Sequence, residues 1–269
     1  MDDYLVLEKL DIGYDKKLVN NIDLKVGKKS IIAFLSPNNG GKTTLIKTLS
    51  GVIQAKDGNI VFDDKSLNKN NFKKYIKKIG VVFEDIHSTY ICEKVDDELK
   101  FPLIHLSYPY SRVTARLKEV AEFLDIEGIL KKNIDDLTTL QKAKLCIGTA
   151  IMHKPKVLLV DDIFKSLNPK DKEIVMDIFK LLVVNYNMSV IFTTSDLRDC
   201  YGIDNIYVIG NNKIMLKGSY EEIIKNDNEL AKVGIEIPLM LDLSRKLEFY
   251  NLIDHVYYDV DEVVNALWK

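Results

Sequence analysis

Short apolar runs separated by turn-forming or charged residues fill the first part of the chain. YLVLEKLDIGY, LVNNIDLKV and SIIAFL have the pattern of β-strands, and so does the β-branched run IGVVFE further on. Between them the sequence predicts a helix that begins at about Lys42 and ends at Gly51, followed by the strand GNIVFDD. We therefore expect the first part of the chain to be rich in strands.

The hydrophobic pattern becomes helical between about residues 88 and 155. SRVTARLKEVAEFLDIEGIL and LQKAKLCIGTAIM have helical periodicity, and Pro102 and Pro109 are expected to break the helices there. Strand signals return with KVLLVDD (156–162) and SVIFTTSD (189–196), with the helical segment DKEIVMDIFKLLVVNY between them. This alternation indicates βαβ units, a mostly parallel sheet and an inserted helical lobe.

The last part of the chain predicts a hairpin and then a short helical tail. NIYVIGNNKIMLKGS is expected to turn at GNN, and the residues after about 220 have helical patterns. We expect residues 1–220 to form one large α/β domain, with its helical subdomain at about 88–155, and residues 221–269 to form a C-terminal extension.

Composition narrows the classes of partner. The 269 residues are 46% hydrophobic and carry a net charge of -2, so no overall electrostatic footprint for nucleic acid is present. We interpret the basic run KKYIKK (73–78) as the solvated face of a helix. Three separated cysteines indicate reduced thiols in a cytoplasmic protein, and the four scattered histidines have no metal-ligand spacing. Without a signal peptide or a long apolar run, we expect no membrane span, although the chain could bind to a membrane protein.

The stretch SPNNGGKTT has the context of a phosphate-binding loop, because it lies between an apolar run and a helical segment. Such a loop offers backbone N–H groups at a helix N-terminus, a lysine for the β- and γ-phosphates and a hydroxyl for Mg²⁺. The pattern G-x-x-x-x-G-K-S/T has glycine where this chain has serine, so the serine must avoid the glycine-only backbone region. An ordinary strand-to-helix connection is the alternative. The expected loop residues are Ser36, Pro37, Asn38, Asn39, Gly40, Gly41, Lys42, Thr43 and Thr44.

VLLVDD places two carboxylates at the C-terminal end of a buried strand. Asp161 is expected at the strand tip, where with Thr43 it can hold Mg²⁺, and Asp162 is expected beside the γ-phosphate as a base for water. Two acidic residues after a strand are also a common way to begin a loop. The assignment therefore depends on the phosphate loop upstream.

In this order the motifs resemble the ATPase subunits of ABC transporters over nearly the whole chain. The resemblance implies an α/β P-loop NTPase fold with a RecA-like, mostly parallel sheet, an N-terminal antiparallel β subdomain, an inserted helical subdomain and a C-terminal helical extension. It also implies ATP and Mg²⁺ as cofactors, with residues 1–220 as the ATP-binding domain. Tyr14 falls where the family stacks an aromatic residue on adenine, and a packed strand tyrosine is the alternative.

Several positions depart from the motifs of that family. Glu84 stands at the Q-loop glutamine and keeps an oxygen for Mg²⁺, Asp162 replaces the catalytic glutamate, and Ser195 replaces the switch histidine. KSLN (165–168) stands for the SALD of the D-loop. The family's LSGGQ signature is replaced by LTTLQ, which consists of Leu137, Thr138, Thr139, Leu140 and Gln141.

In that family two cassettes face each other, and each ATP lies between one phosphate loop and the partner's signature. Thr139 and Leu140 in place of glycine are expected to hinder the approach to the partner's γ-phosphate. Loss of a positioned base costs about 10²- to 10⁴-fold in rate, so we expect ATP to bind here but to be hydrolysed slowly. A homodimer would carry these defects in both sites, which favours pairing with a different ATPase subunit.

The tail VGIEIPLMLDLSRKL (233–247) resembles a G-x-x-x-P-x-x-x-x-L-x-x-x-L segment of the ATPase subunits of energy-coupling factor (ECF) transporters. Those transporters take up vitamins and metal ions. The resemblance implies a second ATPase, a transmembrane coupling subunit and a substrate-binding membrane subunit as partners, at the cytoplasmic face of the cell membrane. A non-hydrolysing scaffold subunit of such a complex and a soluble ABC protein of translation or DNA repair are the alternatives, because fold alone does not fix function.

Overall fold

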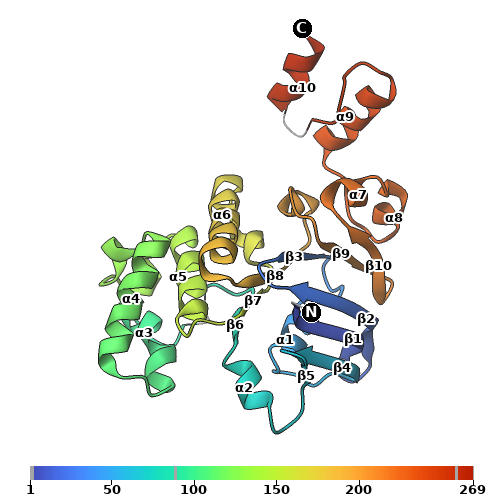
Figure 1. Cartoon of the computed structure of the whole chain (residues 1–269). Coiled ribbons are helices and arrows are strands. Elements are labelled where there is room, and N and C mark those ends of the chain that lie inside the picture. Colours follow the sequence, from blue (N-terminus) through green and yellow to red (C-terminus); the bar gives the residue numbers. More distant parts are fainter. Residues whose placement is uncertain (1–2, 88–89, 258–259, 269) are drawn as a thin grey trace.

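An antiparallel sheet and a mostly parallel sheet pack around helix α1 (Lys42–Leu49) and share a hydrophobic core with it (Figure 1). The computed structural model describes residues 3–87, 90–257 and 260–268. The antiparallel sheet has the order β2-β1-β4-β5. Its strands are β1 (Asp3–Gly13), β2 (Lys17–Gly27), β4 (Asp57–Phe62) and β5 (Lys65–Ser66). Ile22, Leu24 and Val26 of β2 are buried because alternate residues of a strand point to the same side. Val19 is also buried, since an irregularity in the pairing of β1 with β2 shifts the alternation by one residue between Val19 and Ile22.

The second sheet has six strands in the order β10-β9-β3-β8-β7-β6, and all its neighbours are parallel except β9 and β10. Every residue of β7 and β8 is buried, as expected for parallel strands that are covered on both faces. The predicted fold class is thereby confirmed. The strands are β3 (Ile31–Leu35), β6 (Ile79–Val82), β7 (Val157–Val160), β8 (Ser189–Thr194), β9 (Ile206–Gly210) and β10 (Lys213–Gly218).

The predicted turns follow from residues that tolerate a positive φ. Gly51 has φ 76° and follows Ser50, the C-cap of α1, which confirms the predicted end of that helix. Asn211 and Asn212 have φ 49° and 61° between β9 and β10, which confirms the hairpin at GNN. Both turns could be predicted because the backbone conformation depends on one or two local residues.

Helices α3 (Val95–His105), α4 (Tyr110–Leu124) and α5 (Thr139–Ile151) lie at one side of the parallel sheet (Figure 1, left). The expected break at Pro102 is wrong, because this proline lies inside α3. Proline inside a helix costs about 3 kcal/mol, but burial of Val95, Leu99 and Leu103 along one face returns about 1.5–3 kcal/mol for each side chain. Pro109 does separate the helices, since it is the residue directly before α4.

Helix α2 (Phe72–Ile76) carries part of the basic run KKYIKK. Tyr75 is buried, and Lys73, Lys74, Lys77 and Lys78 are exposed, as expected for a solvated face. Helix α6 (Pro169–Tyr186) links β7 to β8 through a short 3-10 helix, η3 (Ile163–Ser166). The expected first residue of the helical lobe, residue 88, lies outside the described residues.

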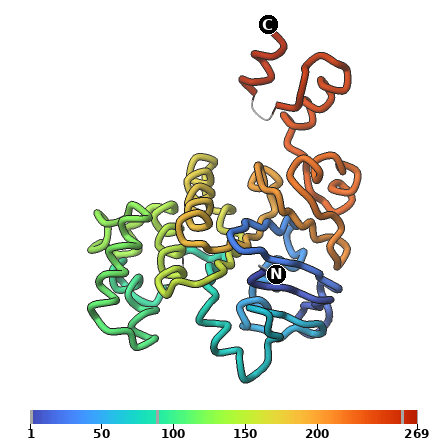
Figure 2. Tube along the Cα trace, in the orientation of Figure 1, coloured from blue at the N-terminus to red at the C-terminus, as the bar shows by residue number. Residues whose placement is uncertain are grey.

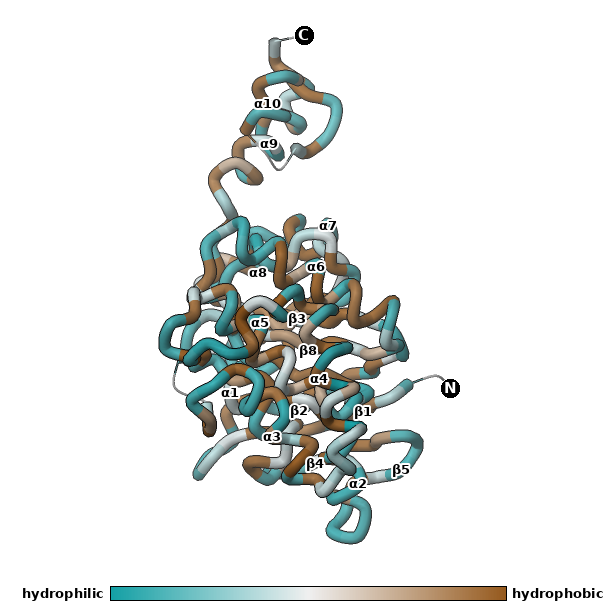
Figure 3. The backbone as a smooth tube through the Cα atoms, turned by 90° about the vertical axis from the view of Figure 1, so that its left-hand side faces the viewer, coloured by the Kyte–Doolittle hydropathy of each residue, from teal (hydrophilic) through white to brown (hydrophobic). Residues whose placement is uncertain are grey.

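The tail consists of α7 (Tyr220–Ile224), α8 (Asp227–Lys232), α9 (Leu239–Phe249) and α10 (Val260–Leu267). Ile223, Ile224 and Leu230 are buried in the main core, whereas the trace of α9 and α10 leads away from the sheets (Figure 2). Hydrophobic and hydrophilic stretches alternate along this outer part (Figure 3). Among the described residues, no helix has the length and apolar character needed to cross a membrane.

Candidate nucleotide-binding site

A pocket of about 580 Å³ opens where the loop before α1 meets the loops that follow β6 and β7. These loops extend from the carboxyl ends of neighbouring strands, which is where open α/β sheets bind their ligands. The pocket is lined by Tyr14, Leu18, Asn38, Asn39, Gly41, Lys42, Thr43, Thr44, Glu84, Asp162 and Lys165. Most of the residues predicted for nucleotide binding therefore surround one cavity.

The loop 36–41 adopts the backbone that a strand-to-helix phosphate loop needs. Asn39 has φ 63°, as expected for a residue that tolerates this region, and Ser36 keeps a negative φ. Gly41 has φ 100°, and a Cβ atom there would lie 2.7 Å from Val19 Cγ2. Close packing of the loop against β2 therefore requires glycine at this position.

Ser36 fits this loop through its contact with Gly40. The serine side chain is fully buried, and a Cβ atom on Gly40 would lie 1.8 Å from Ser36 Oγ. A larger residue at either position would force the loop open. Ser36 at the first position of the motif is thus accommodated by the glycine four residues later.

The ammonium of Lys42 lies against its own loop. Its Nζ atom donates to the carbonyl oxygens of Ser36 (2.8 Å) and Pro37 (3.3 Å), and it lies 3.5 Å from Asp162 Oδ2. The lysine and aspartate side chains are each only 6% exposed. The lysine is therefore held at the N-terminus of α1, beside the backbone N–H groups that suit an anion.

Asp161 is buried directly beyond the end of β7. Its Oδ1 atom accepts a hydrogen bond from Thr193 Oγ1 (2.9 Å), whereas its Oδ2 atom is buried without a hydrogen-bond partner. Burial raises the pKa of Asp161, the hydroxyls of Thr43 and Thr193 oppose this rise, and the charge of Glu84 adds to it. A buried carboxylate oxygen with an unused lone pair is costly unless something binds it.

These residues fit Mg²⁺. The ion is usually bound by one or two carboxylates together with substrate phosphates, and Thr43 lines the pocket beside Lys42. The described residues include no group of three or more histidine, cysteine or acidic side chains placed to bind a metal ion alone. A magnesium ion here would consequently depend on the phosphates for part of its shell.

Asp162 follows at the pocket wall in the left-handed region, with φ 44°. Its backbone N–H donates to Thr193 Oγ1 (3.0 Å), so one threonine orients both aspartates. Burial raises the pKa of Asp162, the charge of Lys42 opposes this rise, and Glu84 and Asp161 add to it. The carboxylate of Asp162 thus lines the pocket and also lies beside the ammonium of Lys42.

Glu84 and Lys165 form an ion pair across the pocket. Lys165 Nζ lies 2.6 Å from Glu84 Oε1, and both side chains remain about half exposed, at 54% and 42%. We predicted a metal contact for Glu84 but no pairing with Lys165. The sequence alone does not indicate this pairing, because the two residues follow β6 and β7, which become parallel neighbours only in the folded sheet.

Tyr14 lies just after β1 and is 52% exposed at the edge of the pocket. Lys47 Nζ donates a hydrogen bond of 3.5 Å to its hydroxyl. The ring is therefore accessible at the edge of the pocket.

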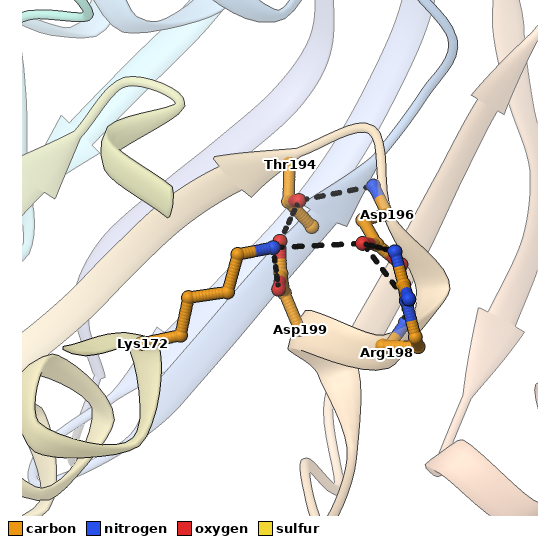
Figure 4. Close-up of polar contacts among 5 residues, drawn as sticks. All are labelled: Lys172, Thr194, Asp196, Arg198 and Asp199. Carbon is orange, nitrogen blue, oxygen red and sulfur yellow. Dashed lines mark hydrogen bonds and ion pairs between the residues drawn. The ribbon is translucent and has the colours of Figure 1, made fainter. Parts of the chain in front are cut away.

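Ser195 does not line this pocket. It lies in a neighbouring groove of about 1130 Å³, together with Pro37, Asn38 and residues of the tail such as Pro238. The loop that carries it is held by charges (Figure 4). Lys172 Nζ on α6 lies 2.8 Å from Asp199 Oδ1 and 3.5 Å from Asp196 Oδ2, and Thr194 Oγ1 donates to Asp199 Oδ2 (2.6 Å).

The segment LTTLQ also lies outside the pocket, at the N-terminus of α5. Gln141 N donates to Thr138 Oγ1 (3.3 Å) and Thr138 N donates to Gln141 Oε1 (3.0 Å), which is a capping box. Leu140 packs against the main core and Leu137 is buried. Thr139 begins the helix. In this chain the segment therefore caps a helix with its own side chains.

Comparison with known proteins places this site in a family context. The chain is 27% identical to the energy-coupling factor transporter ATP-binding protein EcfA1 of Mesomycoplasma hyopneumoniae (strain J) over 95% of this chain and 92% of that protein. It is also 27% identical to EcfA2 of Clostridium perfringens over 91% of this chain and 88% of that protein. The resemblance to ECF ATPase subunits is thereby confirmed.

A solved structure supports the fold. CbiO1 of Clostridium perfringens, part of the ABC transporter complex CbiONQ, superposes with a TM-score of 0.79 at 22% identity, over 92% of this chain and all of that one. The sequence model of the ABC transporter family matches residues 19–165, which is more than half of the chain. The phosphate loop and the paired aspartates both lie within this matched segment, and the two sheets are built from it and from the strands beside it. The chain therefore belongs to the ABC transporter family.

Proposed function

We propose that this chain is an ATP-binding subunit of an ECF-type importer. It would pair with a second ATPase and a transmembrane coupling subunit at the cytoplasmic face of the cell membrane, and power the uptake of a vitamin or metal ion that a substrate-binding membrane subunit recognises. The observation that carries the proposal is the convergence of Lys42, Thr43 and Glu84 on one pocket at the N-terminus of α1. The relatives named as energy-coupling factor ATP-binding proteins support the type of complex.

In this proposal the phosphates and the Mg²⁺ ion of MgATP are bound by different residues of the pocket. The backbone N–H groups of residues 40–44 and the ammonium of Lys42 bind the phosphates. Thr43 and Asp161 hold Mg²⁺, with an oxygen of Glu84 nearby, and Tyr14 stacks on the adenine. The bound Mg²⁺ supplies positive charge at the phosphates.

We further propose that hydrolysis at this site is slow. Asp162, in the position of the base, is held near Lys42, and Ser195 lies in a separate groove. A missing or misplaced base costs about 10²- to 10⁴-fold in rate. Hydrolysis of the ATP on the partner's loop is also expected to be slow, because Thr138 and Gln141 of LTTLQ hydrogen-bond to each other and cap α5. A heterodimer with a complete second ATPase divides these losses between its two sites, whereas a homodimer would carry all of them in both.

A non-hydrolysing scaffold subunit is the second candidate, favoured by the contact between Lys42 and Asp162. To separate the two, the chain is co-expressed with a second ATPase and a membrane coupling subunit, and MgATP binding and hydrolysis are measured on the purified complex. We expect copurification and a hydrolysis rate that falls with Lys42→Ala and rises with Asp162→Glu plus Ser195→His. Lys180→Ala, at an exposed position of α6, serves as the control.

Two results would count against the main proposal. If no complex is recovered and the purified chain does not bind MgATP, the chain is not an importer ATPase subunit. If the complex hydrolyses ATP at the same rate with Lys42→Ala, the site on this chain contributes no turnover and the scaffold function is correct.

A further inference from the structure

The ion pair between Glu84 and Lys165 lies at the pocket and bridges two loops that are 81 residues apart in sequence. Glu84 comes from the loop after β6, and Lys165 comes from η3 after β7. Because their strands are adjacent and parallel, the two loops begin side by side. The pair therefore spans the pocket mouth rather than a distant surface.

The charges that line this pocket balance only when both of its lysines are counted. Glu84 and Asp162 are the carboxylates that line it, and Asp161, the residue before Asp162, is fully buried. The two lysines that line it are Lys42 and Lys165. A triphosphate would meet strong repulsion if only one of the two lysines were present.

Lys42 alone does not balance these charges. Its ammonium donates to the carbonyl oxygens of Ser36 and Pro37 and lies 3.5 Å from Asp162 Oδ2, so these three groups already share its charge. The direct partner of Glu84 is the ammonium of Lys165.

We infer that Lys165 is a further residue of the nucleotide site, whose ammonium neutralises Glu84 and so permits the phosphates of MgATP to enter. This inference rests on the proposed nucleotide binding. Glutamate at this position keeps an oxygen for Mg²⁺ at the cost of an added charge, and Lys165 cancels that charge from the neighbouring loop. The two residues are functionally coupled and act as a unit.

A double-mutant cycle on the full chain tests the coupling. The dissociation constant of MgATP is measured by titration calorimetry for the wild type, Lys165→Met, Glu84→Gln and the double variant. We expect Lys165→Met to weaken binding about fivefold to tenfold, in line with an exposed charge pair worth about 1 kcal/mol. Glu84→Gln added to Lys165→Met is expected to restore binding to within about twofold of wild type.

Controls keep the result specific. Lys170→Met removes an exposed lysine five residues further on that does not line the pocket, and we expect it to leave the dissociation constant unchanged. Because screening weakens exposed charge interactions, the effect of Lys165→Met is expected to shrink at high salt. Circular dichroism melting confirms that each variant is folded.

Three outcomes overturn the inference. An unchanged dissociation constant in Lys165→Met, with Lys42→Ala still weakening binding, makes the pair a surface contact and leaves the proposed function intact. An equal loss with and without Glu84→Gln means that Lys165 acts on the phosphates directly and not through Glu84. Absence of MgATP binding by the wild type removes both the inference and the proposed function.

Discussion

The Nζ atom of Lys42 donates a hydrogen bond to the carbonyl oxygen of Ser36, 2.8 Å away, so the first and seventh residues of the phosphate loop are joined. We expect Lys42→Ala to weaken MgATP binding about 10- to 150-fold, because a hydrogen bond to a charged group is worth about 1.5–3 kcal/mol. Titration calorimetry on the purified chain measures the change. Equal binding by Lys42→Ala and by the control Lys180→Ala would contradict this role.

Replacing Asp161, whose Oδ2 atom is buried, is expected to affect Mg²⁺-dependent ATP binding and the stability of the fold differently. Asp161→Asn is expected to abolish the increase in ATP affinity that Mg²⁺ provides, because a neutral amide is a poor ligand for this ion. The same change is expected to leave the free energy of unfolding of the nucleotide-free chain unchanged or higher, since it removes a buried, incompletely paired charge.

Titration of ATP with and without Mg²⁺, together with urea unfolding, separates these effects. Asp177→Asn, at an exposed position of α6, is the control. Loss of Mg²⁺ dependence together with a large loss of stability would show that the residue only holds the fold.

Local sequence predicted the parts of the site that depend on neighbouring residues. SPNNGGKTT, VLLVDD and GNN each determine a turn or a strand end within a few positions, and the structure has all three where they were expected. The break at Pro102 was wrong because packing of α3 against the core outweighs the cost of a proline in the helix.

Pairs between distant segments could not be predicted in this way. Lys165 meets Glu84, and Lys172 meets Asp199, only after β6, β7 and β8 have been placed side by side. Each residue by itself is an ordinary charged position of a loop or helix. Strand order in the sheet is a tertiary property, so the partner of each charge becomes clear only from the fold.

Lys172 supports the loop that carries Ser195, because it pairs with Asp199, whose side chain is only 4% exposed. Lys172→Met is expected to destabilise the chain by about 1–3 kcal/mol, since it leaves a buried carboxylate with one hydrogen bond, from Thr194. Thermal unfolding would then shift down by about 2–4 °C for each kcal/mol.

Asp199→Asn in the same chain is expected to recover most of this loss, because it removes the unpaired charge. Lowering the pH is also expected to recover stability in Lys172→Met, because protonation neutralises the carboxylate of Asp199. Burial already raises the pKa of Asp199, against the opposing contacts of Lys172 and Thr194. A Lys172→Met chain that melts like the wild type would show that the charge cluster does not stabilise the loop.

His153 is expected to make stability depend on pH. Burial lowers the pKa of His153, the charges of Arg116 and Lys78 lower it further, and a contact of 3.0 Å between its Nε2 atom and the carbonyl oxygen of Ile79 opposes the change. The folded chain thus binds fewer protons at this site than the unfolded chain. The contribution of His153 is fully present above pH 6.5, and it is lost as the pH falls from there through the lowered pKa.

In that window the slope is at most about 1.4 kcal/mol for each pH unit. Urea unfolding from pH 7.5 downward measures it, and His153→Gln is expected to flatten the slope because glutamine keeps a donor for Ile79 without titrating. His87→Gln, at an exposed position, is expected to retain the slope of the wild type. If His153→Gln loses stability on acidification as steeply as the wild type, other groups cause the pH dependence. A flattened slope would identify the contact at the end of α5 as the acid-sensitive point of the helical lobe, remote from the nucleotide pocket.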